Sequence, residues 1–212
     1  LMKEYKLPIG CDVPETIILA DGDFPSHPLA LEWLRQCPYV VCCDGAANTY
    51  IRSGRMPEAI VGDGDSLLPD IKERYASLIH SEAEQETNDL SKAFRFCLSQ
   101  ERKRITIMGA TGKREDHTIG NVSLLADYME QAEVSMMTDY GIFVPIREDS
   151  MFESYIGQQI SVFNMNSTAL SAEGLAYPLS VFTNWWQGTL NEALARHFII
   201  RTEGKVLVFR VF

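Results

Sequence analysis

Two acidic residues separated by a single glycine form the most distinctive pair in the chain. They lie in the segment 62–66, Gly-Asp-Gly-Asp-Ser, where the glycines permit a tight bend that lets Asp63 and Asp65 face one ion. Mg²⁺ commonly takes one or two protein carboxylates and completes its shell with water and phosphate oxygens. The segment therefore predicts a magnesium site, and a turn that carries two solvated acids is the alternative.

Two further acids have a comparable setting. Asp44 opens the segment 44–48, Asp-Gly-Ala-Ala-Asn, whose small residues let a ligand approach the backbone and whose last residue, Asn48, is a second polar candidate. A turn with a helix cap explains this segment equally well. Asp89 ends an acidic stretch and has Lys92 one helical turn later, so it is either a third metal ligand beside a phosphate-binding lysine or part of a capped helix with a surface ion pair.

The segment 109–117, Gly-Ala-Thr-Gly-Lys-Arg-Glu-Asp-His, is the richest in reactive side chains. Small residues followed by cations at a strand-to-helix junction let backbone N–H groups and side chains converge on an anion. The segment lacks the complete P-loop and dinucleotide signatures, so it predicts a general phosphate cradle, with a glycine-rich turn capped by Asp116 as the alternative. The candidate ligand-binding residues here and on the following helix are Lys113, Arg114, Asp116, His117 and Asn121.

Short apolar runs alternate with longer amphipathic segments from Glu15 to about Thr138, which predicts a parallel sheet covered by helices on both faces. The clearest helix spans 88–100, with Asn88 as its N-cap. Ligands of an open parallel sheet bind beyond the carboxyl ends of its strands, and the polar segments above directly follow predicted strands. The predicted strands are 16–20, 39–43, 59–62, 77–80, 104–108 and 134–137.

After about Tyr140 the pattern changes to strands separated by turn residues, with no helix of useful length. The last two strands, 197–201 and 205–211, are predicted to form a hairpin because Gly204 supplies the positive φ of a tight turn. We therefore predict an α/β chain: a mostly parallel, Rossmann-like three-layer sheet domain over 1–140, followed by a small C-terminal antiparallel β-sandwich over 141–212. The remaining predicted strands of this second domain are 142–146, 159–163 and 169–179.

Composition limits the classes of function. The chain has 212 residues, of which 46% are hydrophobic and 23% charged, which excludes disordered, collagen-like and coiled-coil proteins. Its net charge of −10 repels nucleic acid, so we expect no nucleic-acid partner. An acidic protein that handles phosphate esters needs a divalent cation to bridge carboxylate and phosphate, which agrees with the predicted magnesium site.

Cysteine spacing and hydropathy predict a cytoplasmic protein. The cysteines show neither a C-x-x-C nor a zinc-binding spacing, so we expect reduced thiols. No apolar run approaches the roughly 18–20 residues of a membrane span, so no membrane partner is expected, and no secretory leader is evident. No Ser, His and Asp constellation is present either, which disfavours hydrolysis through a protein nucleophile. The cysteines are Cys11, Cys37, Cys42, Cys43 and Cys97.

The order of these four polar segments resembles the thiamin pyrophosphokinase family, and the resemblance covers nearly the whole chain. It implies transfer of a pyrophosphoryl group from ATP to the hydroxyl of thiamin, with release of AMP, by a homodimer whose active sites lie between subunits. It also implies that Asp63, Asp65 and Asp89 hold Mg²⁺. The nucleotide and thiamin sites would be lined by Asp44, Asn48, Lys92, Arg114, Asp116, His117 and Asn121, of which Asp44, Asp65, Asp89, Arg114 and Asp116 are the candidate catalytic residues.

In the second domain, the segment 174–179 resembles the family segment whose aromatic residue stacks on thiamin from the partner subunit, a place that Tyr177 takes here. Stacking suits the flat aminopyrimidine and the charged thiazolium. A strand aromatic half-buried at a domain or dimer seam is the alternative for Tyr177. The family's late Ser-Asn pair falls on Leu190 and Asn191, which leaves Asn191 as the thiamin contact, with Thr189, Trp185 and Trp186 nearby.

Two other positions depart from the family pattern: Asn88 replaces a threonine, and Lys113 replaces a glycine and adds a cation to the cradle. Positioning and electrostatics would supply most of the catalysis, with Asp89 or Asp65 accepting the proton of the substrate hydroxyl if a base is needed. A Mg²⁺-dependent phosphotransferase acting on another alcohol is the competing enzyme. A thiamin-binding protein without turnover is less consistent with three acids crowded around one point.

Overall fold

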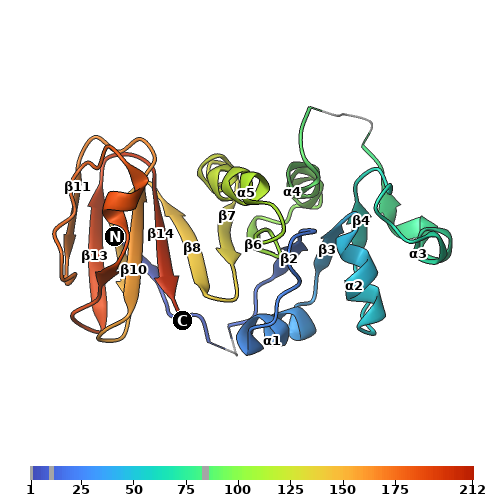
Figure 1. Ribbon diagram of the computed structural model, residues 1–212, viewed down its shortest axis with the longest axis horizontal. Coiled ribbons are helices and arrows are strands. Elements are labelled where there is room, and N and C mark those ends of the chain that lie inside the picture. Colours follow the sequence, from blue (N-terminus) through green and yellow to red (C-terminus); the bar gives the residue numbers. More distant parts are fainter. Residues whose placement is uncertain (1, 10–11, 83–85) are drawn as a thin grey trace.

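The computed structural model describes residues 2–9, 12–82 and 86–212, so Cys11 and part of the acidic stretch before Asp89 lie outside the described residues. The described strands form a ten-stranded sheet in the order β12-β10-β14-β8-β7-β6-β2-β3-β4-β5 and a four-stranded sheet in the order β1-β9-β13-β11. Figure 1 shows helices on both sides of one half of the large sheet, while the small sheet faces its other half. The predicted α/β class, with a sandwich after the parallel strands, is confirmed.

Strands β2 to β7 are parallel and form the predicted Rossmann-like half. The chain starts in the middle with β2, adds β3, β4 and β5 on one side, and then returns to add β6 and β7 on the other. The connections therefore leave neighbouring β2 and β6 in opposite directions, which opens a crevice at their carboxyl ends. The bounds are β2 Thr16–Leu19, β3 Val40–Cys43, β4 Ala59–Val61, β5 Ile79–His80, β6 Arg104–Met108 and β7 Glu133–Met137.

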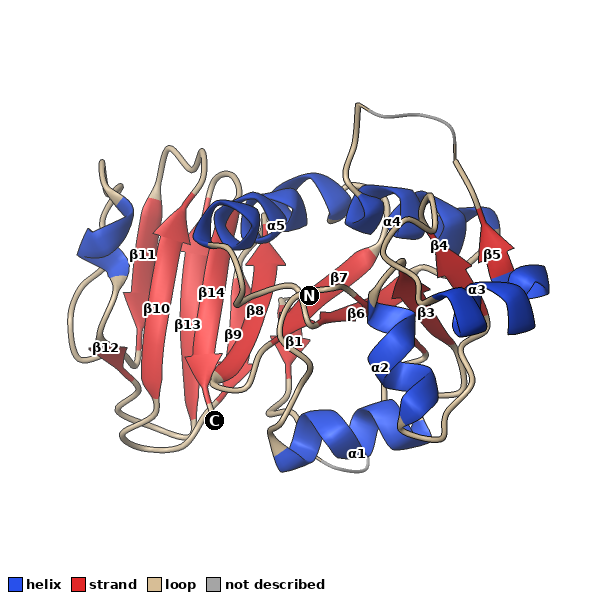
Figure 2. Cartoon of the chain, turned by 45° about the vertical axis from the view of Figure 1, so that its right-hand side comes forward, coloured by secondary structure: helices blue, strands red, loops and turns tan. Residues whose placement is uncertain are grey.

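Helices cover both faces of this half because alternate residues of its strands are apolar on both sides. Ile17 and Leu19 pack with α1, α2 and α3, whereas Ile18 packs with α4 and α5. Figure 2 shows the two helical layers above and below the strands. Asn88 caps α4 as predicted, since its side chain accepts the N–H of Ser91. The helices are α1 Pro28–Gln36, α2 Ala46–Arg52, α3 Pro69–Arg74, η1 Ala76–Leu78, α4 Asp89–Ser99 and α5 Glu115–Tyr128.

The β-sandwich shares the large sheet with the helical half. Strand β8 pairs with β7 on one side and with β14 on the other, so the sheet continues across residue 140. The stacked rings of Phe152 and Phe198 belong to the apolar core between the two sheets. The strands are β8 Gly141–Ile146, β9 Ser150–Glu153, β10 Gln159–Asn164, β11 Leu170–Glu173, β12 Asn191–Glu192, β13 His197–Thr202 and β14 Val206–Val211, with the 3₁₀ helix η2 at Trp185–Gly188.

Three features of the sandwich differ from the sequence prediction. The predicted hairpin between the last two strands is wrong, because β13 lies in the small sheet and β14 lies in the large one. Both strands bury their apolar faces in the core between the sheets. Gly204 does have a positive φ, and a Cβ there would lie 2.7 Å from the Cα of Ser167. The strand predicted over 169–179 ends at Glu173, where Gly174 turns the chain with φ 80°.

The third difference is a set of three unpredicted strands, β1 (Lys3–Tyr5), β9 and β12, of which β1 pairs in parallel with β9 in the small sheet. The N-terminal end of the chain therefore belongs to the sandwich, as its position in Figure 1 shows. Of the described helices, none is long and apolar enough to cross a membrane, and the cytoplasmic location stays a prediction.

Candidate active site

A pocket of about 420 Å³ opens at the carboxyl ends of β2, β3 and β6, beside the first turns of α4 and α5. This is the crevice that the reversal of strand order predicts. Several residues singled out in the sequence line it, namely Asp89, Lys113, Arg114, His117 and Asn121. With Asp21 and Asn88, which also line it, the pocket gathers two acids, two amides and three basic side chains at one edge of the sheet.

The loop between β6 and α5 is held in a conformation that exposes its backbone to the pocket. Gly109 and Gly112 have positive φ, and so does Lys113, with φ 55°. The Gly22 N–H donates to the Gly109 carbonyl at 2.6 Å, and a Cβ on Gly22 would come within 2.4 Å of that carbonyl oxygen. Asn121 donates to the carbonyl of Ala110 at 2.9 Å and so ties α5 to the loop. Close approach of a phosphate to this backbone is consistent with these constraints.

The cations of this loop are paired with acids. Arg114 donates two hydrogen bonds to Asp116, at 3.1 and 2.6 Å, on the exposed rim of the pocket, and these bonds lower the pKa of Asp116. Lys113 donates to the backbone carbonyl of Asp21 at 2.8 Å and to its carboxylate at 3.1 Å. Exposed ion pairs of this kind contribute little to stability, so both cations can exchange their partners for a phosphate.

Asp44 is the most constrained acid of the site. Its side chain is 4% exposed, its φ is 33°, and its Oδ2 accepts the N–H of Ser66 at 3.1 Å. Oδ1 is buried without a hydrogen-bond partner among the described residues. Burial raises the pKa of Asp44, the nearby carboxylates of Asp89 and Asp63 raise it further, and the hydrogen bonds from Ser66 oppose them. The charges of two other acids, Asp89 and Asp63, therefore act on a buried carboxylate that has one oxygen without a hydrogen bond.

The segment 62–66 is tied down from two directions. The amide of Asn48 donates to the Ser66 carbonyl at 2.8 Å and accepts the Leu68 N–H at 3.0 Å, so both ends of this amide hold the loop. The Asp65 N–H donates to the carboxylate of Asp63 at 3.0 Å, and both of these acids are exposed. Asn48 thus positions the acids rather than presenting a free amide.

Within the described part of the chain, no three His, Cys, Asp or Glu side chains are grouped closely enough to form a ready metal site. The donor chemistry nevertheless fits a hard cation, because Asp44 Oδ1 is buried without a hydrogen-bond partner among the described residues and the charges of Asp89 and Asp63 raise the pKa of Asp44, an effect that a cation would oppose. Lys92 is 6% exposed and donates to Asp89 at 3.1 Å, so it offsets part of this charge from below the pocket.

Tyr177 and Asn191 lie in the sandwich and do not line this pocket. The Asn191 side chain is buried, accepts the Tyr177 N–H at 3.0 Å and donates to the Tyr177 carbonyl at 2.8 Å. Tyr177 itself is 63% exposed. Asn191 therefore fixes the backbone that presents the Tyr177 ring to the surface.

Comparison with known proteins identifies the family. Residues 30–137 match the sequence model described as the catalytic domain of thiamin pyrophosphokinase, and residues 141–209 match that of its substrate-binding domain. The chain belongs to the thiamin pyrophosphokinase family.

Individual members of this family are distant in sequence. "Thiamine pyrophosphokinase 1" of rice (Oryza sativa subsp. japonica) is 30% identical over 129 residues, which are 49% of this chain and 49% of that protein. "Thiamine pyrophosphokinase" of Bacillus subtilis is 34% identical over 86 residues, 39% of this chain and 40% of that protein. The chain thus spans about half the length, or less, of the curated relatives it matches.

Solved structures of the family share the fold across the whole chain. The structure titled "Thiamin pyrophosphokinase from Candida albicans" has a TM-score of 0.80 at 18% identity and covers 100% of this chain and 93% of that one. The thiamine pyrophosphokinase structure from Bacillus subtilis has a TM-score of 0.77 at 20% identity, with coverage of 92% and 98%.

Two departures from the family pattern have a structural setting. Lys113, which is predicted from the sequence to replace a family glycine, adopts a left-handed backbone conformation, and its side chain reaches Asp21. Leu190, which is predicted from the sequence to replace a family serine, also has a positive φ of 62° and is 74% exposed. Both positions therefore carry a long side chain on a left-handed backbone conformation, which favours glycine.

Sequence reasoning missed Asp21 and Gly22, which line the pocket after β2. The signal was present, because Asp21-Gly22-Asp23 directly follows the first predicted strand and has the same acid and glycine alternation as the segment 62–66. Asp21 and Gly22 belong to the crevice because they follow β2, which lies between β6 and β3 in the sheet. The order of the strands along the chain does not reveal this position.

Proposed function

We propose that this protein transfers the pyrophosphoryl group of ATP to the hydroxyl of thiamin, giving thiamin diphosphate and AMP. The observation that carries the proposal is the pocket of about 420 Å³ at the carboxyl ends of β2 and β6, which is lined by Asp89 and by the cations of the 109–117 loop. It occurs in a chain of the thiamin pyrophosphokinase family. The residues 1–140 would bind ATP, and the residues 141–212 would supply the thiamin contacts.

The phosphate chain of ATP would lie along the 109–114 loop. Backbone N–H groups of this loop would donate to phosphate oxygens, while Arg114 and Lys113 would leave Asp116 and Asp21 to pair with the phosphates. Mg²⁺, when bound, would neutralise phosphate charge, and Asp63, Asp65 and Asp89 would hold it together with Asp44. His117 and Asn121 would orient the nucleotide from the first turns of α5.

The substrate hydroxyl must lose a proton as the new P–O bond forms. Asp89 is the acceptor we favour over Asp65, because Asp89 lines the pocket and Asp65 does not. The ion pair with the buried Lys92 keeps the Asp89 carboxylate in place during this step. Most of the rate enhancement would come from positioning and from fixed charges around the phosphates.

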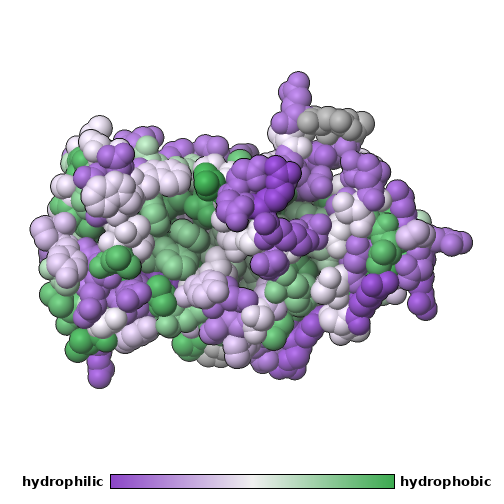
Figure 3. All heavy atoms as spheres, in the orientation of Figure 1, coloured by the Kyte–Doolittle hydropathy of each residue, from purple (hydrophilic) through white to green (hydrophobic). Residues whose placement is uncertain are grey.

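The thiamin site requires a second subunit in this proposal. Tyr177 is exposed and does not line the pocket of its own chain, and further exposed apolar residues accompany it in the segment 177–194. Figure 3 shows apolar side chains reaching the surface over the sandwich. Such exposure supports burial against a second copy, with Tyr177 stacking on thiamin in the partner's pocket. The exposed residues are Tyr177, Val181, Trp185, Trp186, Leu190 and Leu194.

The proposal is tested by incubating the purified protein with ATP, Mg²⁺ and thiamin and separating the products by chromatography. Equal amounts of AMP and thiamin diphosphate, lost on addition of EDTA, are expected. Asp63→Asn should abolish turnover with the fold intact, while the control Asp127→Asn, an exposed acid on α5, should retain it. Formation of ADP in place of AMP would overturn the pyrophosphoryl transfer, and thiamin binding without product would indicate a binding protein.

A further inference from the structure

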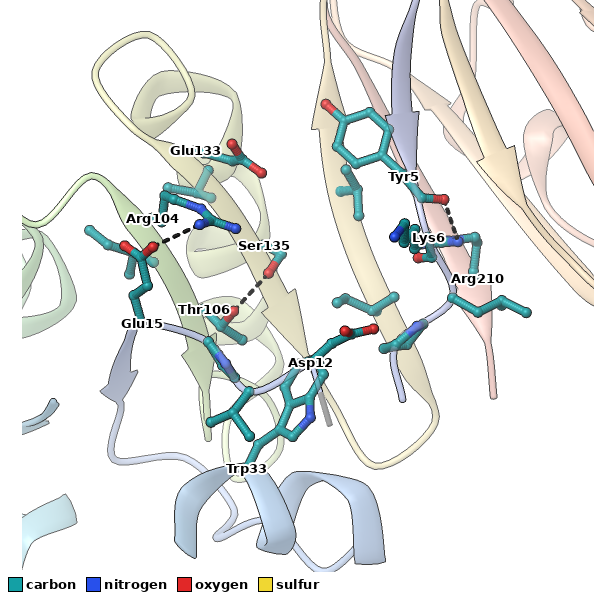
Figure 4. A pocket seen from close by; sticks show the side chains of 18 of the residues that line it. Tyr5, Lys6, Asp12, Glu15, Trp33, Arg104, Thr106, Glu133, Ser135 and Arg210 are labelled. Atoms are coloured by element: carbon teal, nitrogen blue, oxygen red, sulfur yellow. Dashed lines mark hydrogen bonds and ion pairs between the residues drawn. The ribbon is translucent and has the colours of Figure 1, made fainter. Parts of the chain in front are cut away.

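A larger cavity, of about 620 Å³, lies on the opposite side of the catalytic strands. Arg104 and Glu133, the first residues of β6 and β7, both line it, so it lies toward the amino ends of strands whose carboxyl ends form the pocket described above. Figure 4 shows these strands on one side, the N-terminal segment with Tyr5 and Lys6 on the other, and Trp33 of α1 below. We call this cavity the N-terminal groove.

The floor of the groove is polar where a covered parallel sheet is normally apolar. Thr106 of β6 and Ser135 of β7 face the groove, whereas their neighbours along the strands pack beneath α4 and α5. The two hydroxyl oxygens lie 3.1 Å apart, and one donates to the other. A pair of hydroxyls has two protons, so one donor remains for a molecule in the groove.

Arg210 of β14 brings a buried positive charge to the same cavity. The side chain is 3% exposed, and its guanidinium lies 5.2 Å from the centre of the Phe152 ring. Among the described residues, its hydrogen bonds go only to backbone carbonyls: those of Tyr5 at 3.4 Å, Lys6 at 2.9 Å and Glu153 at 2.9 Å. Its Nε–H is buried without a partner among the described residues. Buried charges are normally paired with an opposite charge, so this arrangement is incomplete.

Glu153 is the acid whose charge acts on Arg210, but its carboxylate does not form an ion pair with the guanidinium in the described structure. The Glu153 carboxylate accepts the N–H of Leu7 at 3.0 Å and reaches Arg210 only through its electrostatic field. Burial lowers the pKa of Arg210 to about 10, with Glu153 and Tyr5 opposing this shift, so the guanidinium is still charged at neutral pH. An anion in the groove would supply the missing partner.

The rim and walls restrict which anion fits. Arg104 is paired with Glu15 at 2.7 Å, and further acids at the rim include Glu4 and Asp12, so a multiply charged anion would be repelled. Apolar groups, among them Val13, Ile142 and the Trp33 ring, make up much of the remaining wall. A volume of several hundred Å³ with apolar walls and a few polar groups is typical of a small-molecule site.

We propose that the N-terminal groove binds a small organic carboxylate with an apolar body, whose carboxylate pairs with Arg210 and whose body packs against Trp33. The Thr106–Ser135 pair donates the remaining hydroxyl proton to an acceptor on the ligand. This site is separate from the pocket proposed for ATP and thiamin, so a test of the carboxylate site does not depend on the proposed activity.

The test follows binding of benzoate and hexanoate to the full chain by the NMR signal of the Trp33 indole N–H, assigned with Trp33→Phe. We expect a saturable shift at millimolar concentrations, with affinity at least tenfold weaker in Arg210→Lys, which keeps the charge but loses the Nε–H. The matched control Arg201→Lys alters an exposed arginine on β13 and should bind as the wild type does.

Because Arg210 also anchors three carbonyls, Thr106→Val combined with Ser135→Ala provides a second variant that leaves those contacts intact. A severalfold loss of affinity is expected in this double variant. Absence of a shift with both carboxylates, or unchanged affinity in the double variant, would overturn the site. Equal binding of benzylamine or inorganic phosphate would overturn the assignment to a carboxylate.

Discussion

Replacement of Asp44 by asparagine should raise the stability of the metal-free protein while abolishing its activity. The carboxylate is 4% exposed, has one oxygen without a hydrogen bond, and lies in the field of Asp89 and Asp63. Leaving a buried polar group unsatisfied costs about 1–3 kcal/mol. An asparagine keeps an oxygen for the Ser66 N–H and turns an amide donor toward the neighbouring acids.

We estimate a gain of about 1 kcal/mol in the free energy of unfolding, which for a chain of this size corresponds to a rise in Tm of about 2–4 °C. The sign of the pH dependence follows from the raised pKa of Asp44. Between the unfolded and folded pKa values the folded chain binds more protons, so stability falls as pH rises through this window. Asp44→Asn should remove that fall.

The assay is thermal unfolding with and without Mg²⁺. At a Mg²⁺ concentration about one hundred times its Kd, binding should stabilise the wild type by about 2.7 kcal/mol, and the variant should lose most of this gain. Asp127→Asn serves as the control and should behave as the wild type. The reasoning would be refuted by an Asp44→Asn protein that is less stable without metal and still responds fully to Mg²⁺.

Three further outcomes are expected. Tyr177→Ala should raise the KM for thiamin with little change in ATP binding, measured by steady-state kinetics, and an unchanged KM would defeat the stacking role. Lys113→Gly should raise the KM for ATP several-fold, because it removes a cation that pairs with Asp21 in the absence of ATP. Equal KM values for the variant and the wild type would show that the Lys113–Asp21 pair has only a structural role. Partial burial alone would raise the pKa of Asp139, but hydrogen bonds from residues before α1 outweigh this effect and lower the pKa. Asp139→Ala should therefore lower the free energy of unfolding by about 1 kcal/mol at neutral pH, and this loss should vanish as pH falls through the folded pKa. Chemical denaturation at several pH values tests this prediction.

Much of the helical half could be predicted because its signals are local. Asn88 precedes an amphipathic run and caps α4, and the predicted strand 104–108 has the observed bounds. Asp89, Lys113, Arg114, His117 and Asn121 meet in one pocket because each follows a strand of the same sheet or starts a helix beside it.

What could not be predicted depends on contacts between distant segments. Gly204 permits a hairpin, but burial of both neighbouring strands in one core places them in facing sheets. The Asn48 amide bonds Ser66 and Leu68, about twenty residues away, a contact that no local pattern indicates, and its role toward a ligand stays a prediction. Strand β1 has 3 residues, too few to show the period of a strand, and it pairs with β9, which is distant in the sequence.

The antiparallel pairing of β7 with β8 has a consequence for dissection of the protein. A fragment that ends near residue 140 would expose the hydrogen-bonding edge of β7, and exposed strand edges promote aggregation. The complementary fragment would lack β1 and with it two of the carbonyls that Arg210 holds. The two halves are therefore not interchangeable modules: neither is expected to be recovered alone as a well-behaved protein, and chimaeras with relatives should exchange the shared sheet as a whole.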